Sequence, residues 1–313
     1  MKPPARLQLA TMIATKSFRL SFVVVMALLL ATSARATTNV VATMQPGTLA
    51  FHLATNAAAR VAQFNASPEH MVEIYAPFTL RFDRFFAPSW SHDCWLRGVQ
   101  GLSATCIGFS NSTSGQGLVT MVSPRHYLCA THMHPEFSHL GFLDVNNRLH
   151  WRRTLERVDV ANDTSVGLLD NELPPAVGFL PVLPADYTNY LPTAYGSFVQ
   201  GIGMNQDMYL FSQPTCFGDW NFVNWDSHAA VPFGLTTNWN VTIRGGDSSN
   251  PARLLIGNQL VLITHNFHVN GGPSYARQIP RINQTMHLLS TNHFLHSDYQ
   301  LTEFPLTNWP SFK

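Results

Sequence analysis

The amino-acid sequence predicts a mostly β-sheet protein built as a sandwich or a barrel, and three observations support this prediction. Charged residues make up only 12% of the chain, whereas Asn, Thr, Ser, Gly and Pro are abundant, which is typical of β proteins rich in polar turns. Short apolar or β-branched runs alternate with turn residues, and long helical periodicity is scarce. The clearest runs are 117–122, 127–131, 165–169, 197–202 and 254–264.

Two segments favour helices instead of strands. The first is an Ala-rich stretch at 53–63, and the second is the segment 281–290 near the C-terminus. Residues 37–90 contain no recognisable chemistry, so we expect an N-terminal extension that packs on the main domain. Within 254–264 the dipeptide Gly257-Asn258 predicts the turn of a hairpin.

The N-terminus has the layout of a signal peptide. Four basic residues precede an apolar run at 20–30, and small residues at Ala34 and Ala36 follow at the positions that determine cleavage. A run of about a dozen apolar residues is shorter than the roughly 20 that a spanning helix needs. We therefore expect residues 1–36 to be removed after Ala36, leaving a secreted or periplasmic chain with no membrane segment.

The charge balance argues against polyanionic partners. Nineteen basic residues oppose eighteen acidic ones, and no basic run follows the predicted signal peptide. Such a chain lacks the positive surface that nucleic acids or anionic membranes require. Neither is expected to be a partner.

Four cysteines occur in a chain that is expected to fold in an oxidising compartment: Cys94, Cys106, Cys129 and Cys216. Four cysteines allow three pairings. We favour a disulfide between Cys94 and Cys106, because the intervening loop is short and polar. The pairing of the other two stays open, and Cys129 is as well explained as a buried free thiol.

Three motifs carry candidate chemistry. A short apolar strand with small residues at its end leads to His132, Asp163 precedes the apolar run 165–169, and Ser248 lies in the sequence Arg-Gly-Gly-Asp-Ser-Ser-Asn-Pro at 244–251. Each motif alone has a plain structural interpretation, namely a strand-end histidine, an Asx turn and a polar β-turn. Their combination is more specific, because base, acid and nucleophile follow in the order His, Asp, Ser.

With these motifs, the chain from about 95 to 289 resembles the chymotrypsin-like serine endopeptidases. The resemblance implies two antiparallel six-stranded β-barrels with a C-terminal helix over residues 91–313, acting as a monomer on a protein or peptide without a cofactor or metal. It implies a triad of His132, Asp163 and Ser248, in which Asp163 accepts from Nδ1 of the histidine and Nε2 lies within reach of Ser248. The backbone N–H groups of Gly246 and Ser248 would form the oxyanion hole.

The sequence also departs from the family pattern. Ser249 and Asn250 replace the usual glycines after the nucleophile, which puts the loop geometry in doubt, and Met133 follows the histidine where cysteine is common. No activation motif with a basic residue, a β-branched apolar pair and two glycines precedes His132. Asp247 therefore needs a partner other than a new N-terminus, and the sequence does not identify it.

A glycan at the sequon on Asn162 would crowd Asp163, so a working triad implies a host that does not glycosylate this protein. This favours a bacterial source. By position relative to Ser248, Thr242 is expected near the floor of the substrate pocket and His265 along its wall. The lack of an acidic residue at both positions disfavours cleavage after Lys or Arg. A histidine and a hydroxyl would suit a carboxylate, and a pocket for medium apolar side chains is the alternative.

Two other functions remain open. A peptidase fold that has lost activity would serve as a secreted binding protein, consistent with Ser249 and Asn250. A His-rich metal-binding β protein is the other, because His132 and His134 would share one face of a strand, with Glu136 and His139 nearby.

Overall fold

The computed structural model describes residues 44–63, 77, 88–109, 118–133, 139–218, 221–268 and 270–311. Two units are distinguished, 1–42 and 43–313, and all described residues lie in the second. The predicted signal peptide therefore lies outside the described residues.

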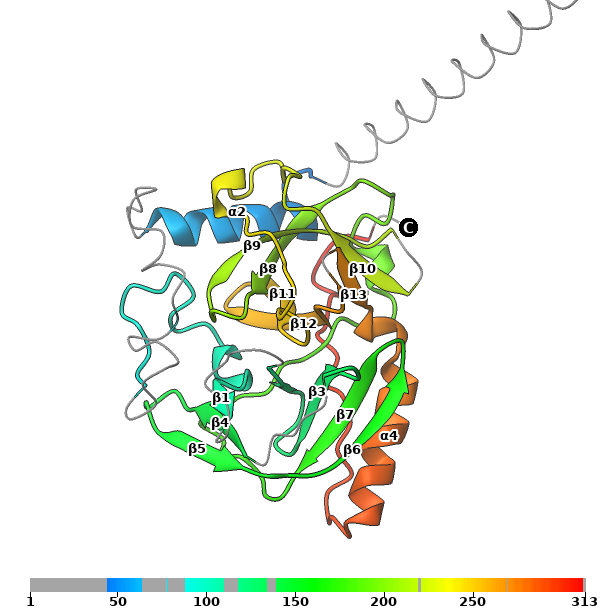
Figure 1. Ribbon diagram of the computed structural model, residues 1–313. Helices are drawn as coiled ribbons and strands as arrows, with labels where there is room; N and C mark the ends of the chain where they lie inside the picture. The colour runs from blue at the N-terminus through cyan, green and yellow to red at the C-terminus, as the bar shows by residue number, and fades with distance from the viewer. Residues whose placement is uncertain are drawn as a thin grey trace, which may run out of the picture. The chain divides into compact units, whose positions relative to one another are not determined.

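The second unit contains thirteen strands and two α-helices in its described part (Figure 1). The strands are β1 (Gly108–Phe109), β2 (Thr120–Met121), β3 (His126–Ala130), β4 (Leu140–Leu143), β5 (Leu149–Arg152), β6 (Thr154–Ala161), β7 (Thr164–Leu169), β8 (Val199–Met204), β9 (Leu210–Cys216), β10 (Phe222–Trp225), β11 (Pro251–Ile256), β12 (Gln259–His265) and β13 (Gly271–Pro273). The helices are α2 (Leu49–Ala62) and α4 (Ile279–Asn292). Both predicted helices and four of the predicted strand runs are thereby confirmed, with small shifts at their ends. Of the fifth run, 117–122, only Thr120–Met121 forms a strand, and residue 117 lies outside the described residues.

The first half of this unit contains a four-stranded sheet in the order β2-β3-β7-β6 and a three-stranded sheet in the order β1-β4-β5. Only Arg153 separates β5 from β6, and the two strands follow one another along one side of the molecule (Figure 1). β3 and β7 pair antiparallel from His126 and Leu168 to Ala130 and Thr164, and the Tyr127 ring of β3 packs against Gly167 of β7. A Cβ at Gly167 would lie 1.9 Å from Cζ of Tyr127, so only glycine fits there.

The second half forms one antiparallel sheet of six strands in the order β12-β11-β8-β9-β10-β13. β11 and β12 form the predicted hairpin, with Gly257-Asn258 as its two-residue turn and Gly257 at a φ of 61°. Leu255, Leu260 and Leu262 of this hairpin join a core cluster that continues into the first half of the unit.

Helix α2 covers the second sheet, where it contacts β8 and β11 (Figure 1). Its buried residues recur on one face of the helix: Leu49, Ala50, Leu53, Ala54, Ala57 and Val61. The hydroxyl of Thr48 accepts from the N–H of Phe51 at 3.3 Å and caps the first turn. Asn56 donates to the carbonyl oxygen of Gly257 at 2.8 Å, which attaches the helix to the β11–β12 turn.

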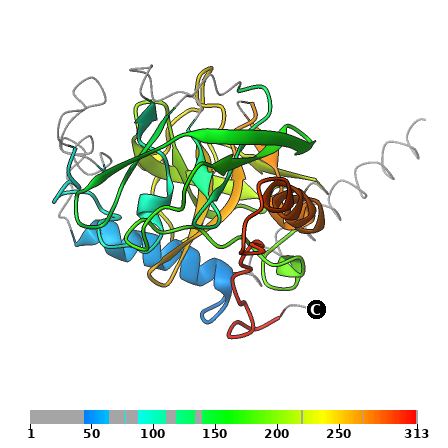
Figure 2. The ribbon, with the colours of Figure 1, turned by 90° about the horizontal axis from the view of Figure 1, so that it is seen from below.

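Helix α4 packs against β6 and β7 and lies apart from α2, as Figure 2 shows with α4 in orange-red and α2 in blue. Pro280 stands in its first turn, where the missing N–H costs nothing. The Gln278 side chain at its start donates to the hydroxyl of Thr164 at 3.1 Å, next to Asp163. The sheet order and this C-terminal helix fit the predicted all-β fold of two chymotrypsin-like barrels.

Candidate active site

His132 lies directly beyond the end of β3. The N–H of Thr131 donates to the carbonyl oxygen of Asp163 at 3.0 Å, which extends the β3–β7 pairing one step past its last strand pair. The N–H of Met133 then donates to the carbonyl oxygen of Ala130 at 3.3 Å. These bonds fix the backbone on both sides of the histidine, while 42% of its side chain stays exposed.

Asp163 occupies the second position of the two-residue turn between β6 and β7. Asn162 and Asp163 both have positive φ, 49° and 59°, and the strands close around them at the pair Ala161 and Thr164. Hairpin turns with two positive φ values favour Asn, Asp and Gly. The residue that makes the turn therefore also delivers a carboxylate to the end of β3.

The Asp163 carboxylate accepts two hydrogen bonds from His132. Nδ1 of the ring donates to Oδ2 at 2.7 Å, and the backbone N–H donates to Oδ1 at 2.9 Å. Because an ionised carboxylate can only accept, Nδ1 carries a proton and Nε2 of the neutral ring keeps its lone pair. This is the tautomer that a general base needs.

The surroundings of Asp163 favour its ionised form. Burial raises the pKa of this carboxyl. The nearby His265 ring and the hydrogen bonds from the backbone and ring of His132 lower it by a larger amount, so the pKa of Asp163 lies below its usual value. A carboxylate that stays charged can orient the imidazole and stabilise an imidazolium.

Ser248 lies in a loop of two consecutive turns. The N–H of Asp247 donates to the carbonyl oxygen of Arg244, and the N–H of Asn250 donates to the carbonyl oxygen of Asp247, each at 3.1 Å. Gly246 is the third residue of the first turn and has a φ of 98°, a conformation that a side chain would strain. Ser248 is the second residue of the following turn and is half-buried.

Asp247 finds its partners inside the protein. Its buried carboxylate accepts from the N–H of Gln206 at 2.6 Å and from the N–H of Arg244 at 2.8 Å. Burial raises the pKa of Asp247, and these two hydrogen bonds compensate only in part, so its pKa is higher than usual. Two backbone donors thus supply the partner that the sequence could not identify.

Ser249 stands where the family has glycine, and it adopts a backbone that suits glycine. Its φ is 73°, its side chain is buried, and its hydroxyl accepts from the N–H of Ala130 at 2.8 Å. Its own N–H donates to the carbonyl oxygen of Asn266 at 2.8 Å. The loop that carries Ser248 is therefore bonded to β3 two residues before His132.

The expected oxyanion donors are free to bind a ligand. Within the described residues, the backbone N–H groups of Gly246 and Ser248 have no hydrogen-bond acceptor. Both residues are only partly buried. Preorganised donors of this kind stabilise developing negative charge.

A cavity of about 240 Å³ lies beside Ser248, with Phe267 and His268 in its wall. The Phe267 ring packs edge-on against the His132 ring, with centroids 6.0 Å apart. In the part of the chain that the structure describes, no hydrogen bond joins His132 to Ser248. The structure thus bonds His132 to Asp163 and places Ser248 at a cavity whose wall contacts His132.

A larger cavity of about 900 Å³ shares Ile243 and His268 with the first one. Thr242 lines it, and its role in a substrate pocket stays a prediction. His265 does not, because it is 2% exposed and its ring faces Asp163 and Tyr275. The expectation that His265 forms the pocket wall is therefore corrected, and His268 is the histidine that lines this cavity. The sequence offered no signal to separate these two histidines.

The predicted disulfide between Cys94 and Cys106 is wrong, because all four cysteines are buried free thiols. Cys106 donates to the carbonyl oxygen of Gly108 at 3.1 Å, and burial raises the pKa of both Cys94 and Cys106 to about 12. Closeness in sequence did not bring the two thiols together, since the chain between them forms its own turns and a 3₁₀ helix at Leu102–Ala104. Cys129 and Cys216 are also unpaired.

The metal-binding alternative rests on residues that are only partly described. His134 and Glu136 lie outside the described residues, and His139 is exposed. Among the side chains that the structure describes, no group of three or more His, Cys, Asp or Glu residues could hold a metal ion. The one described histidine of the pair, His132, is engaged by Asp163.

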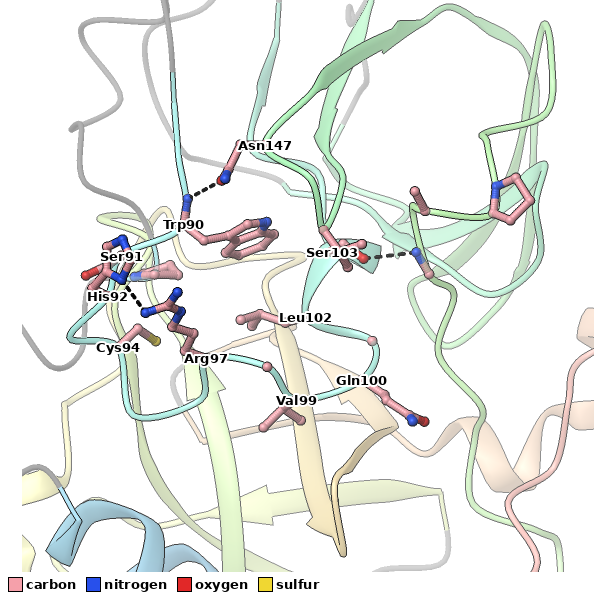
Figure 3. Close-up of a pocket in the computed structure, with 17 residues that line it drawn as sticks. Trp90, Ser91, His92, Cys94, Arg97, Val99, Gln100, Leu102, Ser103 and Asn147 are labelled. Carbon is pink, nitrogen blue, oxygen red and sulfur yellow. Dashed lines mark hydrogen bonds between the residues drawn. The ribbon is translucent and has the colours of Figure 1, made fainter.

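Another cavity, of about 470 Å³, lies around Trp90 and Leu102 (Figure 3). Its polar side chains bond to groups of its own wall. Asn147 accepts from the N–H of Trp90 at 2.7 Å, Ser103 accepts from the N–H of Gly178 at 2.9 Å, and Arg97 contacts His92. None of the predicted catalytic residues lines this cavity.

No protein-family model matches the sequence, and a search of curated proteins finds no match. Among solved structures, the chain is similar to an atomic-resolution structure of HBP, at 12% identity and a TM-score of 0.41, over 54% of this chain and 85% of that one. Because this similarity is so distant, the fold is assigned here from the strand order and register of this chain itself. None of the helices in the described part combines the length and the apolar character that a membrane span requires.

Proposed function

We propose that the protein is a secreted serine endopeptidase that hydrolyses peptide bonds through His132, Asp163 and Ser248. The observation that best supports this proposal is a pair of hydrogen bonds near the end of β3. Asp163 holds His132 with Nε2 free to accept a proton, and Ser249 bonds the neighbouring loop to Ala130. The basic N-terminus and the apolar run before Ala36 support export.

In the proposed reaction, Nε2 of His132 removes the proton from Ser248 as its Oγ attacks the peptide carbonyl carbon. Asp163 stabilises the imidazolium, and the N–H groups of Gly246 and Ser248 bind the oxyanion. The histidine then returns the proton to the leaving amine. Water hydrolyses the acyl-enzyme by the same steps. The attack requires Nε2 and Oγ to approach to about 3 Å.

The larger cavity supports a preference for an apolar side chain before the cleaved bond. Tyr195, Phe198, Trp225 and Ile243 all line it, together with Thr242. Asp226 also lines this cavity, so an acidic residue is present that the sequence argument did not consider. Its Oδ1 accepts from the N–H of His228 at 2.8 Å.

Replacing the nucleophile tests the proposal. Ser248→Ala should abolish hydrolysis of casein and shift the melting temperature by only a few degrees, because it removes one hydroxyl that has no partner among the described residues. The exposed Ser297 offers a matched control, and Ser297→Ala should keep full activity. Full activity in Ser248→Ala would refute the assignment of the nucleophile.

Two observations favour a second function, that of a secreted binding protein without catalysis. Ser248 and His132 share no hydrogen bond within the described residues, and Ser249 replaces a glycine beside the nucleophile. An inactive protein would bind peptides in the same cavities without turnover. Wild-type protein that binds casein peptides and releases no product would favour this function.

A further inference from the structure

A second histidine, His265, lies close to the Asp163 carboxylate. Nε2 of His265 lies 3.8 Å from Oδ2 of Asp163, the same oxygen that accepts from Nδ1 of His132 at 2.7 Å. His265 is the last residue of β12, whereas Asp163 belongs to the β6–β7 turn. The carboxylate therefore lies between an imidazole from each half of the β structure.

The other nitrogen of His265 identifies its tautomer. Its Nδ1 is hydrogen-bonded to the hydroxyl of Tyr275, and both side chains are buried. Burial raises the pKa of Tyr275 well above its usual value, so this hydroxyl keeps its proton. The hydroxyl has no other hydrogen-bond acceptor among the described residues, so it donates to Nδ1, and Nδ1 must be the unprotonated nitrogen.

A neutral imidazole that accepts at Nδ1 carries its proton on Nε2. Burial lowers the pKa of His265 more than the neighbouring Asp163 raises it, which keeps the ring neutral. Within the described part of the chain, Nε2 has no hydrogen-bond partner although it is fully buried. A buried donor without an acceptor is costly, and Asp163 Oδ2 is a charged acceptor less than 1 Å beyond hydrogen-bond distance.

We propose that His265 is a positioning residue for Asp163: Tyr275 fixes its tautomer, and its Nε2–H holds the carboxylate in place for His132. The proposal rests on the proposed hydrolase function, because it assigns His265 a role in orienting that base. The titratable groups around this site are His132, Asp163, Tyr275 and the buried thiol of Cys129. His265 would touch neither substrate nor the reacting atoms.

Nitrogen-15 NMR of the histidine side chains of the full chain tests the tautomer without requiring activity. The expected spectrum shows His265 neutral and protonated at Nε2 at neutral pH, and still neutral at a pH where exposed histidines of the chain have become charged. In Tyr275→Phe, which removes the hydroxyl and keeps the ring, the Nδ1 resonance should shift because it loses the donated hydrogen bond. A proton on Nδ1 in the wild type, or a charged His265 at neutral pH, would overturn the proposal.

Matched variants test the positioning itself. His265→Leu removes the donor, whereas His265→Gln places an amide N–H near the position of Nε2. We expect His265→Leu to raise the midpoint of the Asp163 carboxyl titration, followed by carbon-13 NMR, and to lower kcat about tenfold with little change in KM. His265→Gln should restore both. An unchanged Asp163 titration in a folded His265→Leu would overturn the proposal. If His265→Leu does not fold, the Asp163 titrations of His265→Gln and Tyr275→Phe are compared instead.

The two hypotheses fail in different ways. If the wild type hydrolyses no peptide but His265 shows the Nε2–H tautomer and controls the Asp163 titration, the hydrolase function is wrong and the contact stands. If Ser248 is the nucleophile but His265→Leu changes neither kcat nor the Asp163 titration, the hydrolase function stands and the positioning role is wrong.

Discussion

The hydroxyl of Ser249 gives the sharpest test of how the loop around Ser248 is held in place. It accepts from the N–H of Ala130 at 2.8 Å, and both residues are at most 1% exposed. In Ser249→Ala this buried donor loses its acceptor and water cannot replace it, which costs about 1–3 kcal/mol. We expect the free energy of unfolding to fall by about 2 kcal/mol.

A second substitution separates the hydrogen bond from the backbone strain. The φ of 73° costs a residue with a side chain about 1–2 kcal/mol, which Ser249→Gly releases. Glycine loses about 0.5–1 kcal/mol through the greater freedom of the unfolded chain. Ser249→Gly should therefore be roughly 0.5–1 kcal/mol more stable than Ser249→Ala, although both lack the hydroxyl.

Urea denaturation followed by tryptophan fluorescence at 25 °C measures both differences, with Ser297→Ala as an exposed control that should stay within about 0.5 kcal/mol of wild type. Ser249→Ala as stable as the control would mean that the hydroxyl does not serve Ala130. Ser249→Gly less stable than Ser249→Ala would refute the strain argument.

Two further predictions concern charge. Asp163→Asn should lower kcat by about 10⁴-fold while the protein stays folded, because a carboxamide can no longer enforce a proton on Nδ1 of His132; steady-state kinetics measure this, and a loss below tenfold would contradict it. Burial lowers the pKa of His126 to about 4, so the unfolded chain takes up a proton near pH 6.5 that the folded protein refuses. The free energy of unfolding should therefore fall by about 3 kcal/mol between pH 6.5 and pH 4, and by less in His126→Gln. Urea titrations at each pH measure this fall, and an equal fall in His126→Gln and the wild type would count against His126 as its origin.

The sequence predicted those parts of the site that local patterns determine. Asp163 could be found because a turn residue precedes an apolar strand, and the two positive φ values at Asn162 and Asp163 are what such a turn requires. The loop around Ser248 was recognisable from the glycines, aspartate and serine at 244–251, and Gly246 adopts a φ of 98°, which favours glycine. Both are short-range constraints, so a single sequence contains them.

Long-range contacts could not be predicted in the same way. The partner of Asp247 includes Gln206, which lies 41 positions earlier. His265 reaches Asp163 because β12 ends beside the β6–β7 turn, and nothing in the sequence near His265 indicates that neighbour. The free thiols of Cys94 and Cys106 likewise depend on the packing around each residue and not on their spacing.

Covalent labelling tests the central claim most directly, because it needs the nucleophile, the base and the oxyanion hole together. The protein is treated with an organophosphorus fluoride, and the modified residue is located by peptide mass spectrometry. The account predicts a single adduct on Ser248 in the wild type and in Ser297→Ala, and labelling slowed by several orders of magnitude in His132→Ala. No adduct on the folded wild type, or an adduct on another serine, would contradict it.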